Sequence, residues 1–175
     1  PILARCGVTH GFGTRMSKPP SGTFRPRQVH GVAVHHLRAD AVPVGAIDDV
    51  EADAIYTSTP GQSIGIMTAD CVPILACNES GQAVLAVHAG WRGLANGVIE
   101  AGIASLLDAS PAGEKLCAVV GPHVGPCCYE VDAPVLDAMT LRFGEAAVKA
   151  VSTTTRPGHA QLALGKLALL ALECS

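Results

Sequence analysis

The sequence predicts a layered α/β (α+β) sandwich in which a mixed β-sheet is flanked by helices. Short runs rich in Val and Ile dominate the first two thirds of the chain, and Gly, Pro, Asn or Asp bound them, as is typical of strands. Helical periodicity follows in three later segments. Because strands and helices pack as layers around a shared core, we expect a single domain over residues 1–175.

Six short segments have the length and composition of β-strands, with turn-forming residues between them. Two further segments, residues 17–22 and 152–158, concentrate Ser, Thr, Pro and Gly and are expected to be loops. The expected strands are residues 33–37, 54–57, 63–68, 72–77, 83–88 and 117–121.

Three segments have the apolar spacing of amphipathic helices. In residues 95–108 apolar side chains recur at i, i+4, i+7 and i+8, which places them on one face. Asp132 is expected to cap a second helix, and the leucine-rich residues 161–173 form a third that Gly165 weakens. The inward faces of the first two helices carry Ile99, Ile103, Leu106 and Leu107, and Val135, Leu136, Met139 and Phe143.

Composition excludes several classes of protein. Hydrophobic residues make up 49% of the chain and charged residues 15%, which excludes a disordered polar chain. No apolar run approaches the ~18 residues of a membrane-spanning helix, so we expect no membrane partner. A net charge of −3 argues against general nucleic-acid binding. A chain with its own core does not need a disulfide framework, so its seven cysteines indicate a reducing, cytoplasmic compartment.

The densest functional signal lies at the ends of two expected strands. Asp70 and Cys71 precede one strand, and His88 ends another before a Gly-flanked turn into a helix. Such a turn directs backbone N–H groups outward, where an anion can dock. Arg92, at the start of that helix, adds a planar donor suited to phosphate or carboxylate.

His30 lies ahead of a third strand and completes a set of two imidazoles and one thiol. Three protein ligands from separate strand ends leave a fourth tetrahedral position open, as in catalytic zinc sites. Alternatively, Cys71 is a nucleophile with His88 as its base and Asp70 or another carboxylate orienting the histidine. From the residues alone both interpretations stay open.

The remaining cysteines and histidines carry weaker signals. Cys127 and Cys128 lie in the Gly/Pro-rich loop 121–130, which either forms an anion- or ring-binding turn with Tyr129 or is a rigid loop with buried sulfur. Adjacent residues in a strand point to opposite faces, so His35 and His36 cannot share a site. These two histidines and His159 are expected at the surface, and Cys6, Cys77 and Cys117 as small buried side chains.

Six motifs occur along the chain in a fixed order. They are His10-Gly11-Phe12-Gly13-Thr14-Arg15, Gln28-Val29-His30-Gly31, Ala52-Asp53-Ala54, Thr68-Ala69-Asp70-Cys71-Val72-Pro73-Ile74, His88-Ala89-Gly90-Trp91-Arg92-Gly93, and Gly121-Pro122 through Cys127-Cys128-Tyr129-Glu130-Val131. Together they resemble the bacterial YfiH/laccase-domain family. Members of that family have been called multicopper polyphenol oxidase, purine nucleoside phosphorylase and peptidoglycan editing factor.

The resemblance implies a YfiH-like sandwich with zinc, or alternatively copper, held by His30, Cys71 and His88. It implies phosphorolysis of purine nucleosides (adenosine, inosine, guanosine and methylthioadenosine) together with adenosine deamination. Nucleoside and phosphate are then the partners. Cys71, His88 and Asp70 are the expected catalytic residues, with Asp70 a neighbour of the metal ligands or a proton carrier. Arg15 and Arg92 are expected to hold phosphate.

Three other functions stay open beside it. One is a metal-free Cys71–His88 hydrolase or amidase that edits peptidoglycan precursors, and another is a copper-dependent polyphenol oxidase (laccase). The third is a non-enzymatic metal-binding or partner-binding domain. Several copper sites would need more ligands than seven scattered histidines with no His-x-His pair provide. The stretch between Arg15 and Gln28 is shorter than in the family and lacks its Ser-Leu-Asn-Leu-Gly-type element, so the chain is expected to lack loop and terminal residues.

Overall fold

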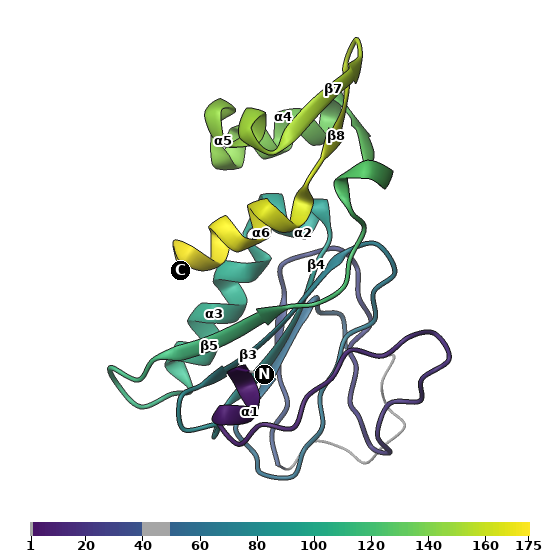
Figure 1. Ribbon diagram of the computed structural model, residues 1–175. Coiled ribbons are helices and arrows are strands. Elements are labelled where there is room, and N and C mark those ends of the chain that lie inside the picture. The colour runs from purple at the N-terminus through teal and green to yellow at the C-terminus, as the bar shows by residue number, and fades with distance from the viewer. Residues whose placement is uncertain (1, 40–49) are drawn as a thin grey trace.

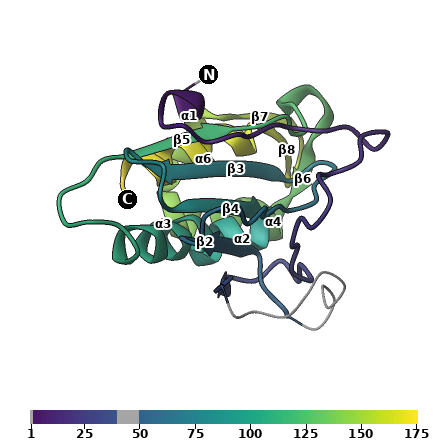
Figure 2. The same ribbon diagram turned by 90° about the horizontal axis from the view of Figure 1, so that it is seen from below.

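A mixed five-stranded sheet forms the centre of the structure, a computed structural model that describes residues 2–39 and 50–175. The strand order is β1-β2-β4-β3-β5, with β1 parallel to β2 and the other neighbours antiparallel (Figures 1 and 2). The strands are β1 (Val34–His36), β2 (Ala54–Thr57), β3 (Val72–Asn78), β4 (Val84–Ala89) and β5 (Leu116–Val120). This sheet confirms the α/β class that the sequence predicts.

The hairpin of β3 and β4 is the most buried part of the sheet. Both strands are continuous apolar runs, and almost every residue in them is buried, as expected for strands covered on both faces. Gly81 turns the chain between them at φ 70°, and a Cβ there would lie 1.9 Å from the carbonyl oxygen of Cys6. The hairpin therefore requires glycine at this position.

Helices α2 (Trp91–Asn96) and α3 (Val98–Asp108) follow β4 directly. They replace the single helix predicted over residues 95–108, because Gly97 adopts a left-handed conformation at φ 90° and ends α2. Helix α3 lies against the sheet through Ile99, Ile103 and Leu106. Leu107 is predicted on the same inward face, but it is 41% exposed and does not lie there.

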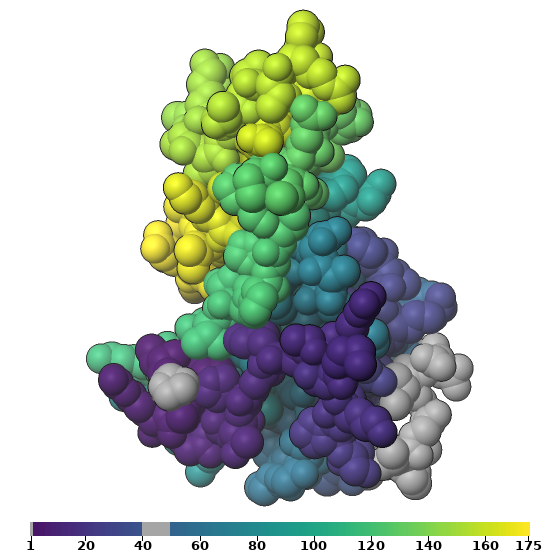
Figure 3. Space-filling view, turned by 45° about the vertical axis from the view of Figure 1, so that its right-hand side comes forward, coloured from purple at the N-terminus to yellow at the C-terminus, as the bar shows by residue number. Residues whose placement is uncertain are grey.

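The C-terminal part adds a second, three-stranded sheet with the order β6-β8-β7. In Figure 3 its yellow-green elements form the top of the molecule, above a base of purple and blue segments. The core of the main sheet continues into this part through Met139, Leu162 and Leu167. Its elements are β6 (Glu130–Asp132), α4 (Ala133–Phe143), α5 (Glu145–Ala150), β7 (Ser152–Arg156), β8 (His159–Leu162) and α6 (Leu164–Glu173), while α1 (Ile2–Arg5) lies near β5.

Three predicted elements differ from the structure. Residues 63–68 form no strand, since only Ile64 pairs, in an isolated bridge with Phe24. Residues 152–158 are largely strand β7 instead of a loop, because Thr side chains tolerate an exposed edge strand. The last helix begins at Leu164, since the residues before it form β8.

The second predicted helix is present as α4, with Asp132 at its N-cap position but without a capping side-chain hydrogen bond. Its apolar face is confirmed, because Val135 and Met139 are buried and Leu136 and Phe143 pack against the same core. None of the helices in the described residues is long and apolar enough to cross a membrane.

Candidate metal centre

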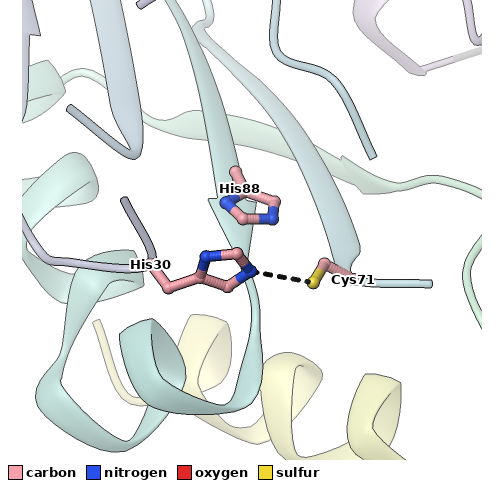
Figure 4. A group of neighbouring side chains, drawn as sticks. All are labelled: His30, Cys71 and His88. Carbon is pink, nitrogen blue, oxygen red and sulfur yellow. Dashed lines mark hydrogen bonds between the residues drawn. The ribbon is translucent and has the colours of Figure 1, made fainter. Parts of the chain in front are cut away.

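The side chains of His30, Cys71 and His88 meet at one end of the main sheet (Figure 4). The antiparallel register of β3 and β4 pairs Val72 with Ala89, so the start of β3 lies beside the end of β4. The candidate ligand atoms of His30, Cys71 and His88 all lie within 4.8 Å of one another. His30 Nε2 is 3.9 Å from Cys71 Sγ, and the two imidazole rings are edge-on with centroids 4.9 Å apart. Residues far apart in the sequence thus form one compact donor group.

Asp53, directly before β2, holds the side chain of His88 and the backbone of His30 in place. Its carboxylate is fully buried and accepts hydrogen bonds from His88 Nδ1 at 2.7 Å and from the backbone N–H of His30 at 2.9 Å. The N–H groups of Val29 and Gly31 also donate to it, at 3.2 and 2.6 Å. Because Nδ1 of His88 faces the carboxylate, its Nε2 is left as the nitrogen that can bind a metal.

The role of Asp53 is not among those predicted from the sequence. Its signal is a carboxylate placed immediately before an apolar strand, within the Ala52-Asp53-Ala54 motif. An unpaired carboxylate is rarely buried, so such a position predicts a polar partner. The partner is 35 residues away in the sequence, in β4.

Backbone conformation and missing side chains make room for the donor group. His30 has φ 59°, the one left-handed non-glycine residue among those described, and Asp53 stabilises this turn through three backbone N–H groups. A Cβ on Gly90 would lie 2.8 Å from His30 Cδ2 and 3.1 Å from Cys71 Sγ. Gly90 therefore leaves the space that the imidazole and the thiol occupy.

The electrostatic surroundings of Cys71 favour its neutral thiol. Burial, followed by the negative charges of Asp70 and Asp53, raises the pKa of the Cys71 thiol. A nucleophilic cysteine needs the opposite shift, from a neighbouring cation. The histidine nitrogen nearest the thiol is Nε2 of His30, whereas His88 is paired with Asp53. A bound cation would instead stabilise the thiolate.

The other predicted site residues occupy different places. Asp70 is exposed, and its backbone carbonyl accepts the N–H of Val124 at 3.1 Å, which ties the start of β3 to the loop after β5. Arg92 is exposed on α2, with its guanidinium 4.4 Å from the centre of the Trp91 ring. Arg15 is also exposed, and within the described chain no hydrogen bond or ion pair links it to the donor group.

Tyr129 lies close enough to the centre to interact with its charged groups. Burial is the main reason that the pKa of its phenol is raised. The negative charge of Asp70, and that of Cys71 when it is ionised, act in the same direction, and Arg92 opposes them. Tyr129 is thus a protonated hydrogen-bond donor at neutral pH.

The loop 121–130 approaches the centre without joining the donor group. A Cβ on Gly121 would lie 2.2 Å from the Phe12 ring, so the loop leaves β5 against the N-terminal segment. Cys127 and Cys128 lie in a 3₁₀ turn and are both exposed, so the expectation of buried sulfur is wrong.

The remaining histidines have local partners. His35 stacks on Phe24 with ring centroids 5.2 Å apart, and His36 on Tyr56 at 4.4 Å. Nδ1 of His159 lies 3.1 Å from the carbonyl oxygen of Pro157.

The donor chemistry fits zinc. Two imidazole nitrogens and one thiolate supply three ligands and leave a fourth position for water or substrate. A carboxylate behind one histidine is the usual outer partner of such a ligand. In residues 2–39 and 50–175 this is the one group of three or more His, Cys, Asp or Glu side chains with such spacing.

The chain is similar to known proteins over most of its length. The family described as multi-copper polyphenol oxidoreductase laccase matches residues 11–175. A purine nucleoside phosphorylase of Pseudomonas aeruginosa is 41% identical over 145 residues, 83% of this chain and 55% of its own length. The purine nucleoside phosphorylase YfiH of Escherichia coli is 42% identical over 119 residues, 68% of this chain and 46% of its own length. The chain thus spans about half the length of these curated relatives.

Solved structures agree with the fold. A Neisseria meningitidis protein of the DUF152 family superposes with a TM-score of 0.73 at 34% identity, over 86% of this chain and 58% of that protein. YlmD from Geobacillus stearothermophilus gives a TM-score of 0.74 at 29% identity, over 89% of this chain and 59% of its own. Both confirm the arrangement of sheet and helices.

Proposed function

Since this chain belongs to the multi-copper polyphenol oxidoreductase laccase family, in which relatives are named purine nucleoside phosphorylases, we propose that it is a zinc-dependent purine nucleoside phosphorylase. We further propose that adenosine, inosine, guanosine and methylthioadenosine are its substrates and that it also deaminates adenosine. The observation that carries this proposal is the donor group of His30, Cys71 and His88 with Asp53 behind it.

In phosphorolysis an oxygen of inorganic phosphate bonds to the anomeric carbon of the ribose while the bond from that carbon to the purine nitrogen breaks. The electron pair of that bond leaves with the purine, which takes up a proton, and ribose 1-phosphate is the other product. Zinc, when bound by His30, Cys71 and His88, would supply a positive charge that anchors and polarises the substrate.

The chain's own residues would orient the reactants. Asp53 fixes the ring of His88 and the backbone of His30, so the donor group is arranged before substrate arrives. The protonated phenol of Tyr129 can donate a hydrogen bond to the purine. In this proposal Arg92 offers its guanidinium fork to phosphate, and Asp70, which is exposed and adjacent to Cys71 in the chain, carries the proton.

Adenosine deamination would use the same metal centre without phosphate. Water adds to the purine carbon that bears the amino group, and ammonia leaves as the carbonyl forms. Arg92 is not required for this reaction. Its replacement by Lys, which keeps the charge and removes the planar fork, therefore separates the two activities.

The test is a nucleoside screen with and without phosphate, combined with elemental analysis of the purified protein. The proposal predicts about one zinc per chain, phosphate-dependent release of purine, and phosphate-independent release of ammonia from adenosine. Arg92→Lys should lower phosphorolysis more than deamination. A copper-loaded protein that oxidises phenols, or turnover of peptidoglycan precursors by the metal-free protein, would overturn the proposal in favour of an oxidase or a Cys71–His88 hydrolase.

A further inference from the structure

The proposed function leaves a pair of neighbouring thiols unexplained. Cys127 and Cys128 are adjacent in the chain, both are exposed, and their sulfur atoms lie 3.3 Å apart. Neither sulfur belongs to the donor group of His30, Cys71 and His88. Two accessible thiols at this distance can bind one atom together.

The backbone around the pair is held by hydrogen bonds. The carbonyl of Cys127 accepts from Gln161 Nε2 at 3.1 Å, and the N–H of Cys128 donates to the carbonyl of Gly125 at 3.0 Å. One residue further on, the carbonyl of Tyr129 accepts the N–H of Leu162 at 3.0 Å. Because the turn is fixed against β8, both thiols are presented together without ordering a flexible segment first.

We propose that Cys127 and Cys128 form a binding site for trivalent arsenic compounds, in which both sulfurs bond to one arsenic atom. Consider one atom bonded to both sulfurs at ~2.3 Å, the length of a zinc–thiolate bond. Because the sulfurs lie 3.3 Å apart, the angle between the two bonds at that atom would be about 92°. Such a near right angle suits pyramidal trivalent arsenic better than tetrahedral zinc. A linear ion such as Cu(I) would need sulfurs ~4.6 Å apart, twice that bond length.

The reaction needs no oxidant. With phenylarsine oxide, each new arsenic–sulfur bond replaces one S–H bond, and the two thiol protons leave with the oxygen as one water molecule. Arsenic stays trivalent throughout, and no electrons are transferred between the protein and the probe.

A disulfide between the two residues is disfavoured by geometry. Adjacent residues joined by a trans peptide have Cα atoms ~3.8 Å apart, shorter than the 4.4–6.8 Å of ordinary disulfides. The structure contains no cis peptide bond in the described residues that would alter this spacing. A ring closed through a larger bridging atom needs less distortion than a disulfide ring. The two thiols are therefore better suited to binding a thiophilic atom than to forming a disulfide.

Another thiol pair is less suited to this ligand. Cys6 and Cys117 have sulfurs 3.7 Å apart, but both side chains are half-buried. The Cys6 thiol also contacts Cys77, which is completely buried. An aryl arsenic group would have to displace packed side chains there, whereas at Cys127 and Cys128 it faces solvent.

The test uses the full zinc-loaded chain and phenylarsine oxide, with intact mass as the readout. We expect the mass to rise by one phenylarsine oxide less one water. The label should resist excess mercaptoethanol and be removed by dimercaptopropanol, because only a dithiol can compete with two bonds to one arsenic. Cys127→Ser and Cys128→Ser should each weaken binding by on the order of 10²- to 10⁴-fold, since the second bond is then lost.

Controls separate this site from the other thiols. Cys174→Ser removes an exposed single cysteine and Cys6→Ser breaks the half-buried pair, so both should keep full labelling. Trypsin places Cys127 and Cys128 on one peptide, residues 116–142, whereas an arsenic bridge from Cys6 to Cys117 would join it to residues 6–15. Joined peptides, dithiol-specific labelling that persists in Cys127→Ser, or release of zinc on labelling would overturn the proposal. Labelling without any nucleoside turnover would overturn only the proposed function.

Discussion

The two ends of strand β3 carry thiols in contrasting surroundings. Directly before its start Cys71 faces His30 Nε2 at 3.9 Å, and burial together with two nearby carboxylates raises the pKa of its thiol. Near its other end Cys77 is completely buried, opposite Cys117 on β5 and in contact with the Cys6 thiol. Cys71 lies among imidazole nitrogens and carboxylates, whereas Cys77 lies beside other thiols.

The contrast shows that neighbouring residues, and not the strand, decide what a cysteine does. Burial raises the pKa at both positions, so both thiols are neutral in the absence of a cation. At Cys71, Gly90 leaves space and the imidazoles offer further ligands. Cys77 is buried beside the thiols of Cys6 and Cys117 and packs as a small hydrophobic side chain. Paired substitutions at the two ends test this interpretation.

The largest effect is expected for Cys71→Ala. Mutation of a residue that only orients a metal ligand typically lowers metal affinity by up to ~100-fold. Loss of one of the three ligands themselves should lower zinc affinity by more than this and should nearly abolish turnover. His30→Ala and His88→Ala should do the same. Cys77→Ala is the matched control and should retain zinc and activity. Full zinc content in Cys71→Ala, measured by elemental analysis, would contradict the ligand assignment.

Asp53→Ala should affect both stability and metal binding. It leaves His88 Nδ1 and three backbone N–H groups without their buried acceptor, so we expect a loss of about 3 kcal/mol in unfolding free energy. Zinc affinity should fall ~10- to 100-fold. The control is Asn78→Ala at the far end of β3, where a buried amide bonds to Glu114 and to the N–H of Ala83. Urea unfolding should detect both losses, whereas only Asp53→Ala should weaken zinc binding.

Two glycines extend the comparison. Gly90 has φ −72°, so an added methyl group there strains no backbone and acts only on His30 and Cys71. We expect Gly90→Ala to weaken zinc binding ~10-fold, the effect typical of disturbing a residue that orients a metal ligand. The free energy of unfolding should be nearly unchanged. Gly81→Ala, at φ 70° and against the Cys6 carbonyl, should instead cost more than ~1 kcal/mol and leave zinc binding intact. The reverse pattern in zinc titrations and thermal unfolding would reject this division.

The smallest effect concerns alkaline pH. Burial, followed by its contact with Cys6, raises the pKa of Cys77 to about 12. Because the folded protein holds this proton more tightly than the unfolded chain, the contribution to stability is complete below the unfolded pKa of ~8.5. It is lost as pH rises from there toward 12. Unfolding free energy should therefore fall more steeply above pH ~9 in the parent than in Cys77→Ala, by at most ~1.4 kcal/mol per pH unit. Parallel curves would show that Cys77 is not responsible.

Much of the main sheet could be predicted from the sequence because β2, β3 and β4 are largely apolar. Residues 54–57 match β2, and 72–77 match β3 except for its last residue. The segment 63–68 has similar composition but lacks a backbone ladder. Its backbone pairing ends after the bridge to Phe24. Beyond it, the backbone N–H and carbonyl of Met67 form hydrogen bonds with the Gln28 side chain instead, both at 2.7 Å. Composition does not distinguish these two kinds of partner.

Part of the candidate site could also be predicted from the sequence. His30, Cys71 and His88 are visible as reactive residues at strand ends, and the structure brings them together, while their catalytic roles stay predictions. Asp53 could not be assigned, because its function depends on contacts with residues 22 to 35 positions away. The exposed edge strand β7 was missed because its Ser and Thr residues resemble those of a loop.

The left-handed turn at His30 has a consequence for how quickly the centre fills with metal. A non-glycine residue in this conformation costs ~1–3 kcal/mol, and here the surrounding fold holds it through Asp53 before any ion arrives. Organising the site is then part of folding and is not coupled to ion capture. We therefore expect loading to follow simple second-order kinetics, with a rate proportional to free zinc and no slow rearrangement of the chain.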